Sequence, residues 1–101
     1  MEISVKHSPG KSLIVVEKNK LIGTENGELQ SLVHESIEKG SKNIVVDLSK
    51  VEYIASWGIG ILVYAYTTCN NKGIQFSLEG VNENVMNILD QLKLDKLFII
   101  N

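Results

Sequence analysis

Residues 43–69 read NIVVDLSKVEYIASWGIGILVYAYTTC, and this stretch decides the fold. It opens on three apolar β-branched residues at 44–46, a run typical of a strand buried on both faces of a sheet. A linker at 49–55 follows, and residues 56–60 lead into an apolar segment long enough for a helix. This order points backbone N–H groups and the positive end of a helix dipole toward Ser56. The pattern therefore nominates residues 56–60 as the functional corner.

Before this stretch, the pattern of apolar residues predicts a hairpin and then a helix. Residues 2–17 alternate, turn at Pro and Gly, and alternate again, which predicts an N-terminal β-hairpin. A short extended piece at 21–23 follows, with Thr24 or Asn26 as the cap of the next helix. Apolar residues at helical spacing over 29–37 form the stripe of that helix.

After this stretch, alternation at 74–79 predicts a half-buried strand. Residues 81–92 carry the stripe of a third helix with Asn82 as its cap, and residues 97–100 form a last short strand or the start of a terminal helix. Alternating strands and helices imply parallel crossovers. The sequence predicts a single α/β domain over residues 1–101, with a central mixed sheet of about four to five strands and helices packed on it.

Length, composition and charge exclude several classes of function. A chain of 101 residues with a net charge of −2 and no Arg offers no basic surface for nucleic acid. Cys69 is the only cysteine, so an intrachain disulfide is impossible and a reducing cytosol is suitable. The N-terminus has no signal-peptide pattern, and the longest apolar run is far shorter than the roughly 20 residues of a membrane span. We expect a cytoplasmic protein without membrane insertion.

Residues 47–60 carry the pattern D-L-S-x-V-x-Y-I-x-S-x-G-I-G, which resembles the signature of STAS domains, named for sulfate transporters and anti-sigma factor antagonists. The family tetrapeptide Asp-Ser-Ser/Thr-Gly, followed by Leu-Gly, stands here as Ala-Ser-Trp-Gly at 55–58, followed by Ile-Gly. The likeness covers nearly the whole chain and implies the STAS fold, usually with one more C-terminal helix, so we expect a shortened C-terminus. It also implies a non-enzymatic antagonist that binds an anti-sigma factor with serine kinase character.

Ser56 admits two interpretations. It caps the helix through its side-chain oxygen, or it accepts a phosphate at the helix N-terminus. The resemblance places the usual phosphoacceptor one position later, at Trp57, which cannot be phosphorylated. We therefore expect binding that lacks the usual phosphorylation switch or is controlled differently.

The partner-binding surface is expected to comprise Glu52, Tyr53, Ser56, Trp57, Gly58 and Gly60. Trp57 either covers the helix start as a core residue or anchors a partner as an exposed hot spot. The two glycines lack the third site of a nucleotide fingerprint, so they are predicted to let the loop and helix approach the sheet closely.

Other chemistry-bearing residues are predicted to be structural. Asp47 ends the buried strand and is expected to bond nearby backbone, and the resemblance implies that it shapes the loop. His7 and His34 have no ligand spacing to Cys69, which argues against a metal site, and no base is adjacent to Ser56. We predict no catalytic residue, cofactor or metal. The alternatives are a STAS scaffold subunit of a larger signalling or transporter assembly, or a small enzyme or ligand-binding protein using Ser56; the oligomeric state stays open.

Overall fold

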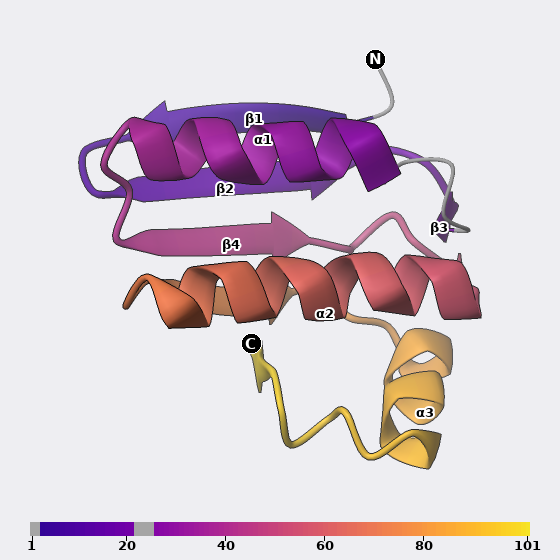
Figure 1. The fold of residues 1–101 in the computed structure, drawn as a ribbon. Coiled ribbons are helices and arrows are strands. Elements are labelled where there is room, and N and C mark those ends of the chain that lie inside the picture. The colour runs from indigo at the N-terminus through magenta and orange to yellow at the C-terminus, as the bar shows by residue number, and fades with distance from the viewer. Residues whose placement is uncertain (1–2, 22–25) are drawn as a thin grey trace.

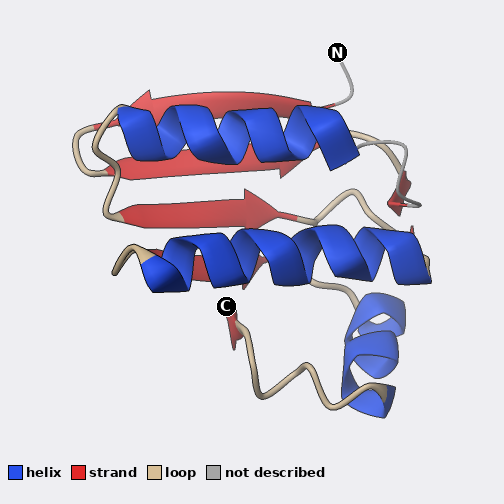
Figure 2. Cartoon of the chain, viewed as in Figure 1, coloured by secondary structure: helices blue, strands red, loops and turns tan. Residues whose placement is uncertain are grey.

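The computed structural model describes residues 3–21 and 26–101, which form a sheet with helices against it (Figure 1). The elements, shown by type in Figure 2, are β1 (Ile3–Ser8), β2 (Lys11–Val16), β3 (Lys20–Leu21), α1 (Asn26–Glu38), β4 (Asn43–Asp47), β5 (Tyr53–Ile54), α2 (Ser56–Asn71), β6 (Gln75–Glu79), α3 (Glu83–Gln91) and β7 (Ile99–Ile100).

The main sheet has five strands in the order β1-β2-β4-β6-β7. β1 and β2 form the predicted antiparallel hairpin, and its turn places Gly10 at a φ of +75°, a conformation that favours glycine. β2, β4, β6 and β7 are parallel neighbours, so α1, α2 and α3 are the crossovers between successive parallel strands. The predicted mixed sheet of an α/β fold is confirmed.

The apolar core lies between the sheet and the helices α1 and α2, both of which lie in front of the sheet in Figure 1. Ile14, Val46 and Leu78 are register partners across three strands and are fully buried on this face. The segment after α3 returns to the same core through Phe98, whose ring packs edge-on against Tyr66 with the ring centroids 5.8 Å apart. The segment that follows α3 therefore packs in the same core as α2.

A second, two-stranded parallel sheet joins β3 to β5. Its register pairs Leu21 with Ile54, and both side chains are buried. The sequence pattern predicted residues 49–55 as a linker, and this is wrong for Tyr53–Ile54, because a two-residue strand is too short to show a period. This small sheet is the support on which α2 begins.

Element ends differ from the predictions by one or two residues in several places. The cap predicted at Asn82 is confirmed. Because α3 ends at Gln91, Leu92 lies beyond the helix, and its side chain is 53% exposed. Asn26 is the first residue of α1 rather than a residue before it, and Thr24 and residues 22–23 fall outside the described residues. In the described part of the chain no helix has the length and apolarity that crossing a bilayer requires.

Candidate functional site

The functional corner, residues 56–60, forms the first turn of α2 and is held by the backbone of β3. The Ala55 N–H donates to the Leu21 carbonyl at 2.9 Å. The same carbonyl lies against Gly58, where a β-carbon would overlap the Leu21 oxygen and approach the Leu21 carbonyl carbon to 2.9 Å. Leu21 is fully buried, so the start of α2 is seated on a fixed point of the small sheet.

The two glycines of the functional corner have different roles. The close approach predicted for both is confirmed for Gly58, which is buried against the small sheet. Gly60 is exposed, and a β-carbon there would have nothing within 4 Å. The absence of a side chain at Gly60 therefore leaves open surface on the first turn of α2.

Ser56 is exposed at the first helical position, so the predicted capping role is wrong. Ala55 is the N-cap residue, with extended φ and ψ of −94° and 168°, and no side chain caps this end of α2. The pattern placed the helix start one residue late, because a serine before an apolar run is a common capping signal. Its hydroxyl has no hydrogen bond to another described residue.

Trp57 projects from the start of α2 with 80% of its surface exposed. The interpretation of Trp57 as a core residue that covers the helix start is therefore wrong, and its role as a partner anchor stays a prediction. Tyr53 on β5 is 51% exposed. The Glu52 and Tyr53 N–H groups both donate to the Asn19 carbonyl, at 2.8 and 3.2 Å, so this exposed pair is presented by a fixed backbone.

An open hollow of about 290 Å³ with mixed polar and apolar walls lies beside Ser56, between the start of α2, β5 and α3. It is lined by Tyr53, Ile54, Ala55, Ser56, Ile59, Ile88, Gln91 and Leu92. Sequence reasoning missed the wall formed by Ile88 on α3 and by Leu92 just after it, because both residues belong to the predicted apolar stripe of this helix. Leu92 is 53% exposed, which shows that this side of the hollow lies at the protein surface.

The loop between β4 and β5 is shaped by two polar side chains. Asp47 Oδ1 accepts from the Ser49 N–H at 2.8 Å, which confirms the predicted bond to nearby backbone. Asn82 Oδ1 accepts from the Val85 N–H at 2.9 Å, while Asn82 Nδ2 donates to the Val51 carbonyl at 2.6 Å. One side chain thus caps α3 and holds the loop that leads to Glu52 and to Tyr53 on β5.

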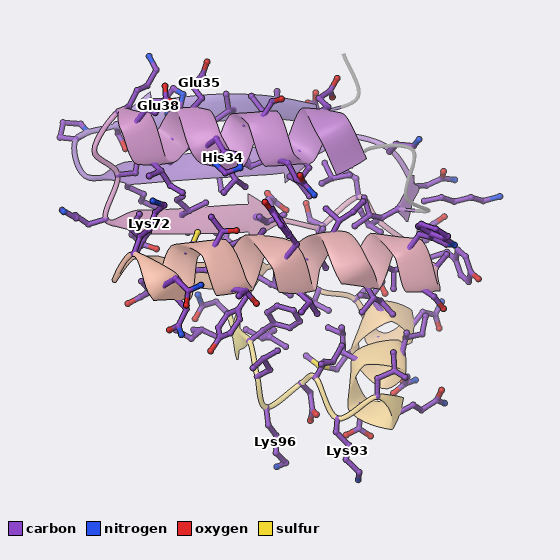
Figure 3. The ribbon with its side chains drawn as sticks, in the orientation of Figure 1. His34, Glu35, Glu38, Lys72, Lys93 and Lys96 are labelled. Atoms are coloured by element: carbon purple, nitrogen blue, oxygen red, sulfur yellow. The ribbon has the colours of Figure 1, made fainter. Side chains whose placement is uncertain are left out.

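A second polar cluster, which the sequence did not indicate, lies far from the functional corner. His7 Nδ1 and Ser12 Oγ are 2.8 Å apart, and Ser12 Oγ lies 2.6 Å from Ser41 Oγ. His7 Nε2 lies 3.0 Å from a carboxylate oxygen of Glu35 on α1, labelled in Figure 3. Both serines are buried, so the chain of bonds ties β1, β2 and α1 together rather than presenting a nucleophile.

Groups that hold metals or react as thiolates are not found at the functional corner. No three His, Cys, Asp or Glu side chains gather as a metal site would require among residues 3–21 and 26–101. Burial of the Cys69 thiol in α2 raises its pKa from 9.0 to about 11, which keeps it protonated near neutral pH. The functional corner instead exposes the Trp57 indole and the Ser56 hydroxyl at the positive end of a helix dipole.

The STAS domain family model matches residues 2–101. The chain belongs to the STAS domain family. It is 30% identical over 87 residues to a Thermotoga maritima protein named as a candidate anti-sigma factor antagonist, covering 84% of this chain and 77% of that protein. A homologue from Thermotoga neapolitana is 29% identical over 89 residues, covering 86% of this chain and 79% of the relative.

Solved STAS structures share this arrangement of sheet and helices. The crystal structure of the Thermotoga maritima protein has a TM-score of 0.79 at 26% identity and covers 97% of this chain and 84% of that one. At 10% identity the likeness shows the fold alone for SpoIIAA of Bacillus in its unphosphorylated form, with a TM-score of 0.80 over 98% of this chain and 87% of that one. The anti-sigma factor antagonist-like assignment thus agrees with both sequence and fold.

Proposed function

We propose that this STAS protein binds an anti-sigma factor with serine kinase character through the functional corner and its flank, and that it does so without catalysis. The exposure of Trp57 carries the proposal, because an indole that is 80% exposed contributes little to the core and leaves a large apolar surface free for a partner. Tryptophan is enriched among the residues that dominate binding energy at protein interfaces.

The surroundings of Trp57 suit a protein partner better than a small substrate. Tyr53 and Leu92 add exposed apolar area, and the hollow beside Ser56 can receive one apolar side chain. Glu52 and Ser56 supply a polar rim, the usual border of such an interface. Gly58 supports this surface from inside, and Gly60 lets a partner approach the helix closely.

The names of the relatives support one class of partner. Two homologues are named as candidate anti-sigma factor antagonists, and this supports an anti-sigma factor as the protein that the functional corner meets. Competitive binding would then free a sigma factor, and we propose that this takes place in the cytoplasm.

Control by phosphorylation is proposed to be absent or altered here. A phosphate on Ser56 would sit at the positive end of α2 and bring about −1.5 to −2 charges into the interface, which would expel a partner. SpoIIAA, which shares the fold, has a structure in a phosphorylated form. In this chain the position after Ser56 is Trp57, whose side chain carries no hydroxyl.

Intact-mass measurement tests this proposal. The purified protein is incubated with ATP and each purified anti-sigma factor of the organism that encodes it, and complex formation is followed by calorimetric titration. We expect a saturable complex with one of them and no gain in mass. A stoichiometric phosphate on Ser56 would contradict the altered switch alone, whereas the absence of any complex would contradict the partner.

A further inference from the structure

The main sheet has a second face, opposite to α1 and α2, which we call the open face. The register places three rows across it: a first row of Ser8, Lys11, Asn43 and Gln75, a middle row of Lys6, Leu13, Val45, Ser77 and Ile99, and a last row of Ser4, Val15, Asp47 and Glu79. The alternate residues of the same strands form the helix-covered face. No described helix packs on the open face, since α1 and α2 share the other one and α3 contacts β5.

The apolar side chains of the open face lie near its middle, between polar and charged residues. Leu13, Val15 and Ile99 lie outside the core cluster; Leu13 and Val15 are half-buried and Ile99 is 47% exposed, whereas Val45 and Ser77 between them are buried within the chain itself. Purely parallel sheets occur almost only with both faces covered. Four of the five strands of this mixed sheet are parallel and α1 and α2 cover one face, so an uncovered second face is a feature that an interface would explain.

Charges on the open face are separated into two diagonal corners. Lys6 and Lys11 lie on β1 and β2 near the start of β2, whereas Asp47 and Glu79 lie on β4 and β6 at the strand ends. Lys6, Lys11 and Glu79 are exposed and Asp47 is half-buried. None of the four forms an ion pair with another described residue. The face is therefore self-complementary, with a basic corner, an apolar middle and an acidic corner.

We propose that the open face binds a second copy of this chain and forms a two-fold symmetric dimer. A two-fold interface uses one patch on both copies, so a patch with both charges can pair with itself. A two-fold axis perpendicular to the strands would place Lys6 opposite Lys6 of the second copy. An axis parallel to the strands would place Asp47 opposite Asp47 of the second copy. Both arrangements bring like charges together. An axis along the uncharged diagonal places the basic corner over the acidic corner, which corresponds to near-orthogonal sheet packing.

This dimer is independent of the proposed function. The open face and α2 lie on opposite sides of the main sheet (Figure 1), so the functional corner stays free in each copy. The dimer would present two functional corners to partners.

Sedimentation equilibrium of charge-swap variants tests the dimer. We expect the full chain to dimerise reversibly and more weakly as salt rises, and Lys11→Glu or Glu79→Lys alone to raise the dimer dissociation constant at least about tenfold. The double variant Lys11→Glu with Glu79→Lys should recover most of the loss, because each swapped charge then faces its swapped partner in the other copy. Leu13→Asp should give a monomer with unchanged circular dichroism.

The control is Lys72→Glu, an exposed change on the helical side of the molecule, labelled in Figure 3. It should leave the dimer unchanged. A wild-type chain that stays monomeric at the highest attainable concentration would overturn the proposal. A dimer that persists in Leu13→Asp, or a double variant no better than the single ones, would overturn it as well.

Discussion

Gly58 in the first turn of α2 lies directly against the Leu21 carbonyl of β3, with no room between them for a β-carbon. The carbonyl also accepts the Ala55 N–H at 2.9 Å. The Leu21 carbonyl thus fixes the position of Ala55, the residue before α2, and it also sets how closely the first turn of α2 approaches β3. The direction of Trp57, one residue away, follows from this contact.

Alanine substitutions at the two glycines of the functional corner should have opposite effects. Gly58→Ala forces the helix away from Leu21 and should lower the free energy of unfolding by about 2–4 kcal/mol. Gly60→Ala meets nothing and removes a flexible residue from a helix, so it should raise stability by about 0.5–1 kcal/mol. Urea unfolding of the pair measures both, and equal effects at the two sites would contradict the contact.

The side chain of Asn82 should have two separable contributions to stability. Asn82→Ser keeps an oxygen to cap α3 but is too short to reach the Val51 carbonyl, and should cost about 1 kcal/mol. Asn82→Ala loses the cap as well and should cost about 2 kcal/mol. Thermal unfolding should rank wild type above the serine variant and the serine variant above alanine. Serine and alanine variants of equal stability would show that the cap contributes nothing.

Cys69 should make stability depend on alkaline pH. Its pKa is raised to about 11 by burial, whereas the unfolded thiol keeps its value of 9.0. Between these values the unfolded chain loses a proton that the folded chain retains, so stability falls as pH rises from 9 to 11. The difference in unfolding free energy between wild type and Cys69→Ala should be flat below pH 9 and shrink above it. A difference that is constant across this range would show that the thiol is not shielded.

Much of the fold follows from the sequence because its periodic patterns are long. Apolar β-branched residues at 44–46 predict a buried central strand, and all three are buried. The stripe that begins at Leu29 belongs to a helix of 13 residues, long enough for its period to be clear. Asn82 is of a residue type that is preferred at helix N-caps, and it is the N-cap of α3.

What the sequence could not predict depends on contacts between distant segments. The pairing of Leu21 with Ile54 is parallel and non-local, and neither strand is long enough to show a period. Ser56 is of a residue type that is preferred at helix N-caps, yet Ala55 is the N-cap of α2. The hydrogen bond from the Ala55 N–H to the Leu21 carbonyl fixes where the helix starts. Ser77 alternates like a surface residue but is buried on the open face.

The measurement that tests the central claim most directly is calorimetric titration of the partner anti-sigma factor with wild type, Trp57→Ala and Tyr64→Ala. Tyr64 is a matched aromatic of α2, 47% exposed and outside the functional corner. We predict that Trp57→Ala keeps the wild-type unfolding curve and weakens binding at least about tenfold, while Tyr64→Ala binds like wild type. Undiminished affinity of Trp57→Ala, or an equal loss in Tyr64→Ala, would contradict docking through the functional corner.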